Sequence, residues 1–134
     1  MPIETEIYWD DEVNNLLIGK MRGTGTWEDF HRFHDAVFDK AHTADAEIVH
    51  FAFMTDVDTP KGSPFPHYKR IVRRWDTFER SGQYFIVLSP ALKRKRWIIE
   101  LVNIAKTMLG RNDFPFVDSI EDARLMVSQI EDAY

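Results

Sequence analysis

The chain has 134 residues, of which 44% are hydrophobic and 13% aromatic, and it carries 22 acidic residues against 17 lysines and arginines. This length and composition predict one domain over residues 1–134 and exclude the disordered, collagen-like and coiled-coil classes. Because the chain has no cysteine, disulfides, thiolate zinc sites and cysteine nucleophiles are excluded as well.

The sequence shows no sign of a membrane span or an export signal. Its longest apolar run, residues 84–88, is far shorter than the ~20 residues that cross a bilayer. Its first residues are acidic, whereas a signal peptide begins with a cationic segment. We therefore expect a cytoplasmic protein without a membrane span.

The predicted elements begin with two short strands, 4–9 and 16–22, which form a hairpin. The first helix, 27–42, follows Thr26, an N-cap residue that has an acidic residue three positions later, as in a capping box. A nearly unbroken apolar strand, 47–55, comes next and is typical of a strand covered on both faces. A proline-rich loop then separates the two halves of the chain.

In the second half, helices and strands continue to alternate. Gly82 and Gly110 are predicted to end the two middle helices. The resulting order, β-β-α-β-α-β-α-β-α, predicts an α/β fold with a mixed, mostly parallel five-stranded sheet whose first strand is antiparallel. The predicted elements are helix 67–80, strand 84–88, helix 90–109, strand 114–117 and helix 120–133.

This order and the ending of the chain resemble a known family. Residues 114–124 read FPFVDSIEDAR, a short strand followed by an Asp-Ser turn and an acidic helix start. With the hairpin entry and four strand–helix units, this segment resembles the SpoIIAA-like group of STAS-like domains. The resemblance implies a STAS-like fold and a small non-enzymatic domain, often homo-oligomeric, that binds a protein partner or an apolar ligand.

The resemblance also directs attention to the turn after the third strand. In STAS antagonists a phosphorylatable serine lies there in an Asp-Ser-Ser-Gly-like turn, but residues 54–59 of this chain read MTDVDT and depart from that pattern. The candidate phosphorylation sites are therefore the nearby hydroxyl residues Thr55, Thr59 and Ser63.

Charge is strongly segregated along the chain. Residues 1–60 carry 13 acidic and 4 basic residues, a net charge of −9, whereas residues 61–111 carry 3 acidic and 12 basic residues, a net charge of +9. The last segment, 112–134, returns to −5 with 6 acidic residues and 1 arginine. The basic block therefore falls on the second and third predicted helices.

The position of these bases suggests a ligand site. Ligands of open α/β sheets bind beyond the carboxyl ends of the strands, and cations in a first helical turn oppose the helix dipole unless an anion is bound there. The alternative is a solvated basic face paired with nearby carboxylates. Nucleic acid is not expected, because the net charge is negative and no binding module is recognised. The candidate ligand-binding residues are Asp56, Asp58, Ser63, His67, Lys69, Arg70, Ser89, Lys93 and Arg94.

The third helix is apolar over nearly half of its circumference, which is wider than a simple core-facing stripe of ~100°. Such a helix is either buried on two sides within the chain or faces a partner or an apolar pocket. We expect a homodimer that forms through this helix, at Trp97, Leu101 and Met108.

No metal or cofactor is expected. His31 and His34 stand three apart on the first helix, but a core histidine is the commoner outcome at such a position. Asp10, Asp11 and Asp56 imitate the carboxylates of a receiver domain, although the first strand leads into a hairpin and not into a helix.

Together these patterns favour a non-enzymatic binding or regulatory module of the SpoIIAA-like type. We expect it to bind a protein partner or an anionic or apolar, lipid-like ligand at the carboxyl edge of the strands. Two alternatives stay open: a small hydrolase or phosphate-handling enzyme that uses Asp56, Asp58 and His67, and a purely structural dimerising domain.

Overall fold

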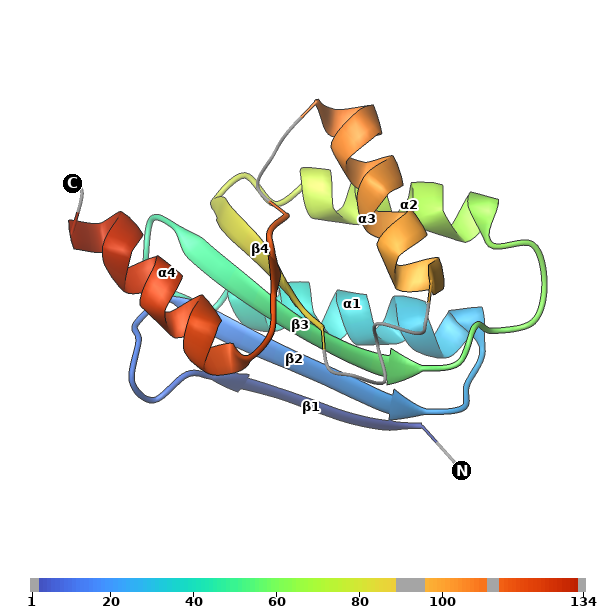
Figure 1. Cartoon of the computed structure of the whole chain (residues 1–134), viewed down its shortest axis with the longest axis horizontal. Helices are drawn as coiled ribbons and strands as arrows, with labels where there is room; N and C mark the ends of the chain where they lie inside the picture. The colour runs from blue at the N-terminus through green and yellow to red at the C-terminus, as the bar shows by residue number, and fades with distance from the viewer. Residues whose placement is uncertain (1–2, 89–95, 111–113, 133–134) are drawn as a thin grey trace.

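Helices and strands alternate after an opening hairpin in the computed structural model, which describes residues 3–88, 96–110 and 114–132 (Figure 1). In chain order the elements are β1 (Glu4–Trp9), β2 (Leu16–Gly23), α1 (Trp27–Ala41), β3 (Val49–Val57), α2 (Phe65–Asp76), β4 (Ser81–Val87), α3 (Arg96–Leu109), β5 (Phe116–Val117) and α4 (Ile120–Asp132).

The five strands form one sheet in the order β1-β2-β3-β4-β5. β1 pairs antiparallel with β2, and every later pair of neighbours is parallel. The α/β class and the mixed, mostly parallel sheet of five strands are therefore confirmed.

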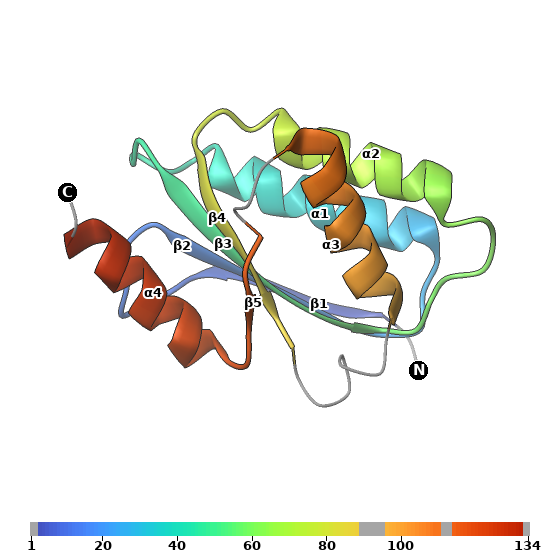
Figure 2. The same cartoon turned by 45° about the horizontal axis from the view of Figure 1, so that its top comes forward.

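The helices lie on both faces of the sheet, with α1, α2 and α3 on one face and α4 on the other (Figure 2). Side chains alternate along β3 accordingly: Phe51 and Phe53 pack in the cluster of α1–α3, and Ala52 packs in the cluster of α4. The first three helices share a face because successive right-handed crossovers advance across the sheet in one direction.

α3 is packed into the core of its own chain. Trp97 and Leu101 are only 5% and 2% exposed, and Trp97 Nε1 donates to the carbonyl of Val57 at 3.0 Å. Its wide apolar arc is thus used within the chain, which corrects the expectation that Trp97 and Leu101 face a partner. Met108 is 48% exposed, so of the three predicted contact residues it alone lies at the surface.

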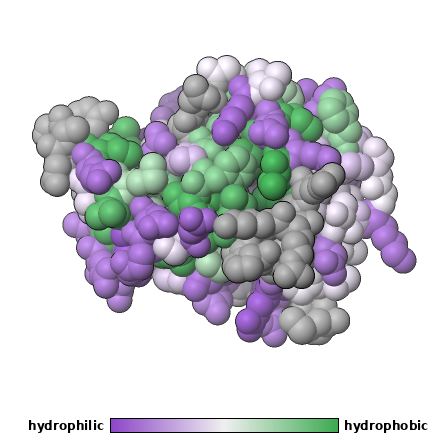
Figure 3. Space-filling view, in the orientation of Figure 1, coloured by the Kyte–Doolittle hydropathy of each residue, from purple (hydrophilic) through white to green (hydrophobic). Residues whose placement is uncertain are grey.

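One face of the molecule shows apolar surface between α4 and α3, with polar side chains around it (Figure 3). Each of these two helices also carries a largely exposed apolar side chain, Met108 on α3 and Leu125 on α4. The predicted homodimer through α3 stays a prediction, and Met108 is its exposed residue.

The two ends of α1 agree with the sequence pattern, whereas the end of α2 does not. The capping box is present, since Thr26 Oγ1 accepts from the backbone of Asp29 at 3.2 Å and Asp29 Oδ2 accepts from the backbone of Thr26 at 2.9 Å. α2 ends at Asp76 and not at residue 80. Arg80 instead donates to the carbonyls of Ala44 and Ala46 at the end of the preceding crossover.

Gly82 has a different role from the predicted helix stop, because it lies inside β4. A Cβ atom at this position would come within 2.5 Å of the His50 ring, whose Nδ1 accepts from the backbone of Gln83 at 2.9 Å. The glycine is needed for this close approach. Gly110, by contrast, follows α3 with a φ of +60°, as expected for a glycine that ends a helix.

α4 is tied to the β1–β2 turn by one arginine. Arg124 donates to Asp10 Oδ1 through Nε at 2.9 Å and through Nη2 at 2.7 Å, and it also contacts Glu121. The buried Asp10 carboxylate further accepts from the backbone of Val13 at 2.8 Å and of Glu12 at 3.2 Å. Burial raises the pKa of Asp10, but these hydrogen bonds outweigh it and hold the pKa below its usual value.

Candidate functional site

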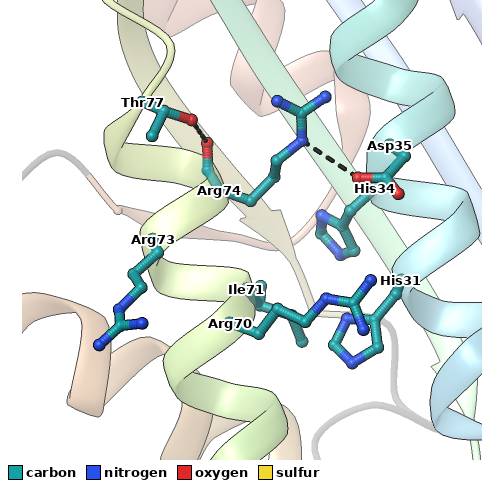
Figure 4. A pocket seen from close by; sticks show the side chains of 8 residues that line it. All are labelled: His31, His34, Asp35, Arg70, Ile71, Arg73, Arg74 and Thr77. Carbon is teal, nitrogen blue, oxygen red and sulfur yellow. Dashed lines mark hydrogen bonds and ion pairs between the residues drawn. The ribbon is translucent and has the colours of Figure 1, made fainter.

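A groove of about 340 Å³ runs between α1 and α2 on the outer side of the helix layer. We call it the α1–α2 groove; Figure 4 shows its lining from close by. Its position follows from the fold, since α1 and α2 are neighbours on the same face of the sheet. The residues that line it are His31, His34, Asp35, Arg70, Ile71, Arg73, Arg74 and Thr77.

The polar lining comes from side chains spaced three or four apart on each helix. Arg70, Arg73, Arg74 and Thr77 belong to the face of α2 opposite the buried Ile71 and Trp75. Residues at this spacing share one side of a helix, so the amphipathic pattern that packs α2 on the sheet also collects its arginines at the surface.

The three arginines differ in their partners. Arg74 donates through Nε to Asp35 at 3.1 Å, lies 3.9 Å from Asp39 and rests over the Phe38 ring at 5.1 Å. For Arg70 and Arg73, the described part of the chain contains no ion pair. Within the described residues, the charge of Arg74 is thus compensated by an ion pair, and the charges of Arg70 and Arg73 are not.

The directions of these side chains also differ, as Figure 4 shows. The guanidinium of Arg70 reaches toward α1 and lies beside the His31 ring, whereas the Arg73 side chain extends from the other side of α2. Arg70 therefore points toward α1 across the α1–α2 groove and has no ion pair among the residues that the structure describes.

His31 forms a hydrogen-bonded pair with His67, the third residue of α2. His31 Nε2 and His67 Nδ1 are 2.8 Å apart, and the rings are 5.1 Å apart at an angle of 36°. On its other side His67 stacks on Trp27, with 4.7 Å between centroids and 6° between planes. One ring donates and the other accepts, as two neutral imidazoles do.

The pKa of His31 is lowered. Burial is the main cause, followed by the positive charge of Arg70 and by His67, while Glu28 and Asp35 act in the opposite direction. A lowered pKa keeps His31 neutral in the empty groove at neutral pH.

His34 lies at the bottom of the α1–α2 groove and is a core histidine. Its Nδ1 accepts from Trp75 Nε1 at 3.2 Å, so the neutral ring carries its proton on Nε2. Burial, with smaller contributions from His31 and Arg74, lowers the pKa of His34 to about 3. Its Nε2 is buried and has no hydrogen-bond partner among the described residues.

A small cavity lies on the inner side of His34. Its volume of about 10 Å³ is the size of one water molecule. His34 and Thr55 supply its polar groups, and the remaining lining, which includes Phe30 and Phe53, is apolar. The space is too small for an acyl chain, so this cavity does not support the predicted lipid-like ligand.

The structure separates the sequence-predicted ligand-binding residues. Arg70 lines the α1–α2 groove, and His67 borders it through its hydrogen bond to His31. Lys69 lies over the Phe65 ring, with 4.9 Å between Nζ and the ring centroid. Asp58 and Ser63 are exposed in the segment between β3 and α2. Ser89, Lys93 and Arg94 lie outside the described residues.

Asp56 lies on the opposite face of the sheet from His67. It pairs in register with Arg22 and lines a separate hollow of about 300 Å³ together with Lys20 and Met54. Acidic and basic side chains are mixed there, and Arg22 Nε donates to Glu4 at 2.6 Å. Asp56 and His67 therefore do not share a surface on which a common active site could form.

The candidate phosphorylation sites differ in accessibility. Thr55 is only 5% exposed and faces the core, so a kinase cannot reach it in the folded chain. Thr59 and Ser63 are both exposed and stay candidates.

The sequence pattern did not identify His31, Arg73 and Arg74 as residues of a binding groove. The signal that could have found them was the combination of Arg70, Arg73 and Arg74 on one helical face with a histidine at the edge of the apolar stripe of α1. Periodicity finds such a face on each helix but does not show which two faces meet.

The chain matches no family model and no curated protein. In the described part of the chain, none of the helices combines the length and apolarity that crossing a bilayer requires.

Proposed function

We propose that the chain is a non-enzymatic binding module of the SpoIIAA-like, STAS-like type that recognises an anionic group of its ligand in the α1–α2 groove. The proposal rests on the position of Arg70. Its guanidinium points into the groove, and it forms no ion pair with the residues that the structure describes. A guanidinium in such a position is suited to hold a carboxylate or a phosphoryl group through paired N–H donors.

The surrounding charges support an anion and disfavour a cation. Arg74 is compensated by Asp35, and the uncompensated Arg73 lies on the next turn of α2. The net charge of the groove lining is therefore positive even when its histidines are neutral. The proposed site therefore lies one layer outward from the strand edge, between α1 of the acidic segment and α2 of the basic segment.

Binding is favoured over catalysis because the reactive groups of the groove are already engaged. The Thr77 hydroxyl donates to the carbonyl of Arg74 at 2.9 Å, and the Asp35 carboxylate accepts from the Arg74 side chain. The two histidines of the lining each use one ring nitrogen in a hydrogen bond. His31 bonds to His67, and His34 accepts from Trp75. Thr77 and Asp35 would have to give up their bonds to act as a nucleophile or a general base.

The proposal is tested by titrating phenyl phosphate and acetate into the protein at low and high salt by calorimetry. Arg70→Ala should weaken binding by about tenfold or more, since a charge-assisted hydrogen bond is lost. Arg73→Ala is the matched control: it removes a charge that also has no ion pair among the described residues, from a lining side chain that extends away from α1. It should weaken binding by about threefold or less, through the longer-range charge alone.

Two outcomes contradict the proposal. The first is that neither anion binds at any salt concentration, and the second is that Arg70→Ala and Arg73→Ala have equal effects. Equal effects would indicate a diffuse basic surface, not a groove with a defined receptor group.

A further inference from the structure

The α1–α2 groove combines one inward-pointing cation with a histidine pair that can gain a second positive charge. Arg70 supplies the first charge, and its guanidinium lies beside His31. His31 and His67 share a hydrogen bond of 2.8 Å. When such a pair takes up a proton, the bond becomes a charge-assisted N–H⁺···N bond, which is stronger than the neutral one.

The atoms available for this proton can be stated. In the neutral pair each ring carries one N–H, so the ring that donates the shared bond has its other nitrogen bare. The added proton binds to that bare nitrogen, and the shared hydrogen bond is kept.

The charges around the pair come from two helices, with a third close by. On α1, Glu28 and Asp35 favour the charged form of His31, and on α2, Arg70 and His67 oppose it. His31 in turn acts on the buried His34, as does Arg74. On α3, Glu100 acts on Tyr68, the residue next to His67.

We propose, building on the function proposed above, that the α1–α2 groove binds the dianionic phosphoryl group of a phosphomonoester and that the His31–His67 pair takes up one proton as this group binds. Arg70 balances one negative charge of the ligand, and the proton on the pair balances the second. A singly charged group needs only Arg70 and takes up no proton.

The geometry supports this coupling in three ways. The pair borders the groove through His31, which lines it beside Arg70. The stack of His67 on Trp27 holds the second ring in place, so the pair is organised before the ligand arrives. In the empty groove Arg70 disfavours the extra proton, and an anion bound between them offsets that repulsion.

The first arm of the test compares phenyl phosphate with phenyl sulfate, which have the same shape but differ by one charge near neutral pH. We expect phenyl phosphate to bind more tightly, on the order of tenfold. Equal affinities would overturn the dianion assignment.

The second arm measures proton uptake, from the binding enthalpy in two buffers with different ionisation enthalpies. Phenyl phosphate should be bound with net proton uptake, and phenyl sulfate without it. The ³¹P chemical shift of the bound phosphate separates the two places where the proton can go. A chemical shift typical of the phosphate dianion assigns the proton to the protein. A chemical shift typical of the monoanion shows that the ligand carries the proton and overturns the proposal.

Variants then assign the proton to the pair. His67→Gln should abolish the uptake and leave Arg70-dependent binding of phenyl sulfate in place. His31→Gln should have the same effect if the variant folds, since His31 is buried. His67 is only partly buried, so His67→Gln tests the pair independently. The control, His42→Gln, removes an exposed histidine at the far end of α1 and should leave the uptake unchanged. Undiminished uptake in His67→Gln would refute the role of the pair.

Failure of this inference is distinguishable from failure of the proposed function. If both anions bind through Arg70 with equal affinity and without proton uptake, the groove is an anion site but the histidine pair plays no part. If Arg70→Ala changes nothing, the proposed function itself is wrong.

Discussion

The imidazole of His67 lies flat on the indole of Trp27, with ring centroids 4.7 Å apart and planes 6° apart. Trp27 opens α1 and is itself 5% exposed, because Tyr68 of α2 and Trp97 of α3 pack against it edge-on at 5.9 and 5.6 Å. The first turns of all three helices thus meet at one indole. The position of His67 is fixed by the core, although its ring is partly accessible.

A first prediction concerns this indole. Trp27→Ala should lower the free energy of unfolding by about 3–5 kcal/mol, because it leaves a cavity where three helices meet. Trp27→Phe should lower it by only about 1 kcal/mol, since it keeps a ring for His67 and removes a buried Nε1 that has no partner among the described residues. Urea unfolding at neutral pH measures both. Equal losses would show that the aromatic stack contributes nothing.

A second prediction concerns the pH dependence that His34 imposes. Its pKa is about 3 in the folded chain and returns toward 6.5 on unfolding. Below about pH 6.5 the unfolded chain therefore binds a proton that the folded chain does not, and folding loses about 1.4 kcal/mol per pH unit down to about pH 3. The contribution of His34 to stability is complete above that window.

His34→Asn keeps an acceptor for Trp75 Nε1 and removes the titrating group, so its stability should fall less steeply with acid than that of the wild type. Unfolding free energies measured between about pH 7 and 4 give the two slopes. His42→Asn is the control, because His42 is exposed. Parallel curves for wild type and His34→Asn would contradict the prediction.

A third prediction concerns the Asp10 carboxylate, whose folded pKa is depressed. Such a group stabilises the fold above its unfolded pKa of about 4, and this stabilisation is lost as the pH falls through the lower folded value. Asp10→Asn should therefore lower the free energy of unfolding by about 2 kcal/mol at neutral pH, and the difference from wild type should shrink below about pH 4.

The matched control is Asp11→Asn. Asp11 lies 3.8 Å from the same arginine, but its side chain is 91% exposed, so the change should stay below about 0.5 kcal/mol. Thermal or urea unfolding of both variants across the acid range checks the comparison. A pH-independent difference for Asp10→Asn would mean that its charge is not what stabilises the turn.

A fourth prediction concerns Gly82. Gly82→Ala should destabilise the protein by about 1–3 kcal/mol, because the new methyl group would overlap the His50 ring. In a His50→Ala background the same substitution should cause a much smaller loss, and the double-mutant cycle measures the coupling. If the loss is equal in both backgrounds, the overlap with His50 is not its cause.

Local patterns predicted those elements whose ends are set by nearby residues. The start of α1 was predictable because Thr26 and Asp29 cap it through each other. The end of α2 was not, because Phe78 continues the apolar pattern and is buried although it lies beyond the helix. Arg80 likewise donates to the carbonyls of Ala44 and Ala46, before β3. Helical spacing does not predict a partner so far away in the sequence.

The candidate site was predicted only in part for the same reason. The charge block directs attention to the second helix, and of the candidates on it Arg70 lines the α1–α2 groove and His67 bonds to His31 at its border. The sequence did not show that His31 would lie beside Arg70 and His67. Periodicity places His31 at the edge of the apolar stripe of α1 but does not show which helix packs next to that edge. Asp56 lies on the face of the sheet opposite α2 because side chains alternate along a strand. This could be predicted only if β3 was known to extend to Val57.

The contact between Arg124 and Asp10 joins residues 114 positions apart in the chain. During synthesis the N-terminal hairpin emerges well before α4 does, so the face formed by Leu16, Ile18 and Ala52 has no helical cover until residues 120–132 have been made. Until then this apolar face is open to association with other chains.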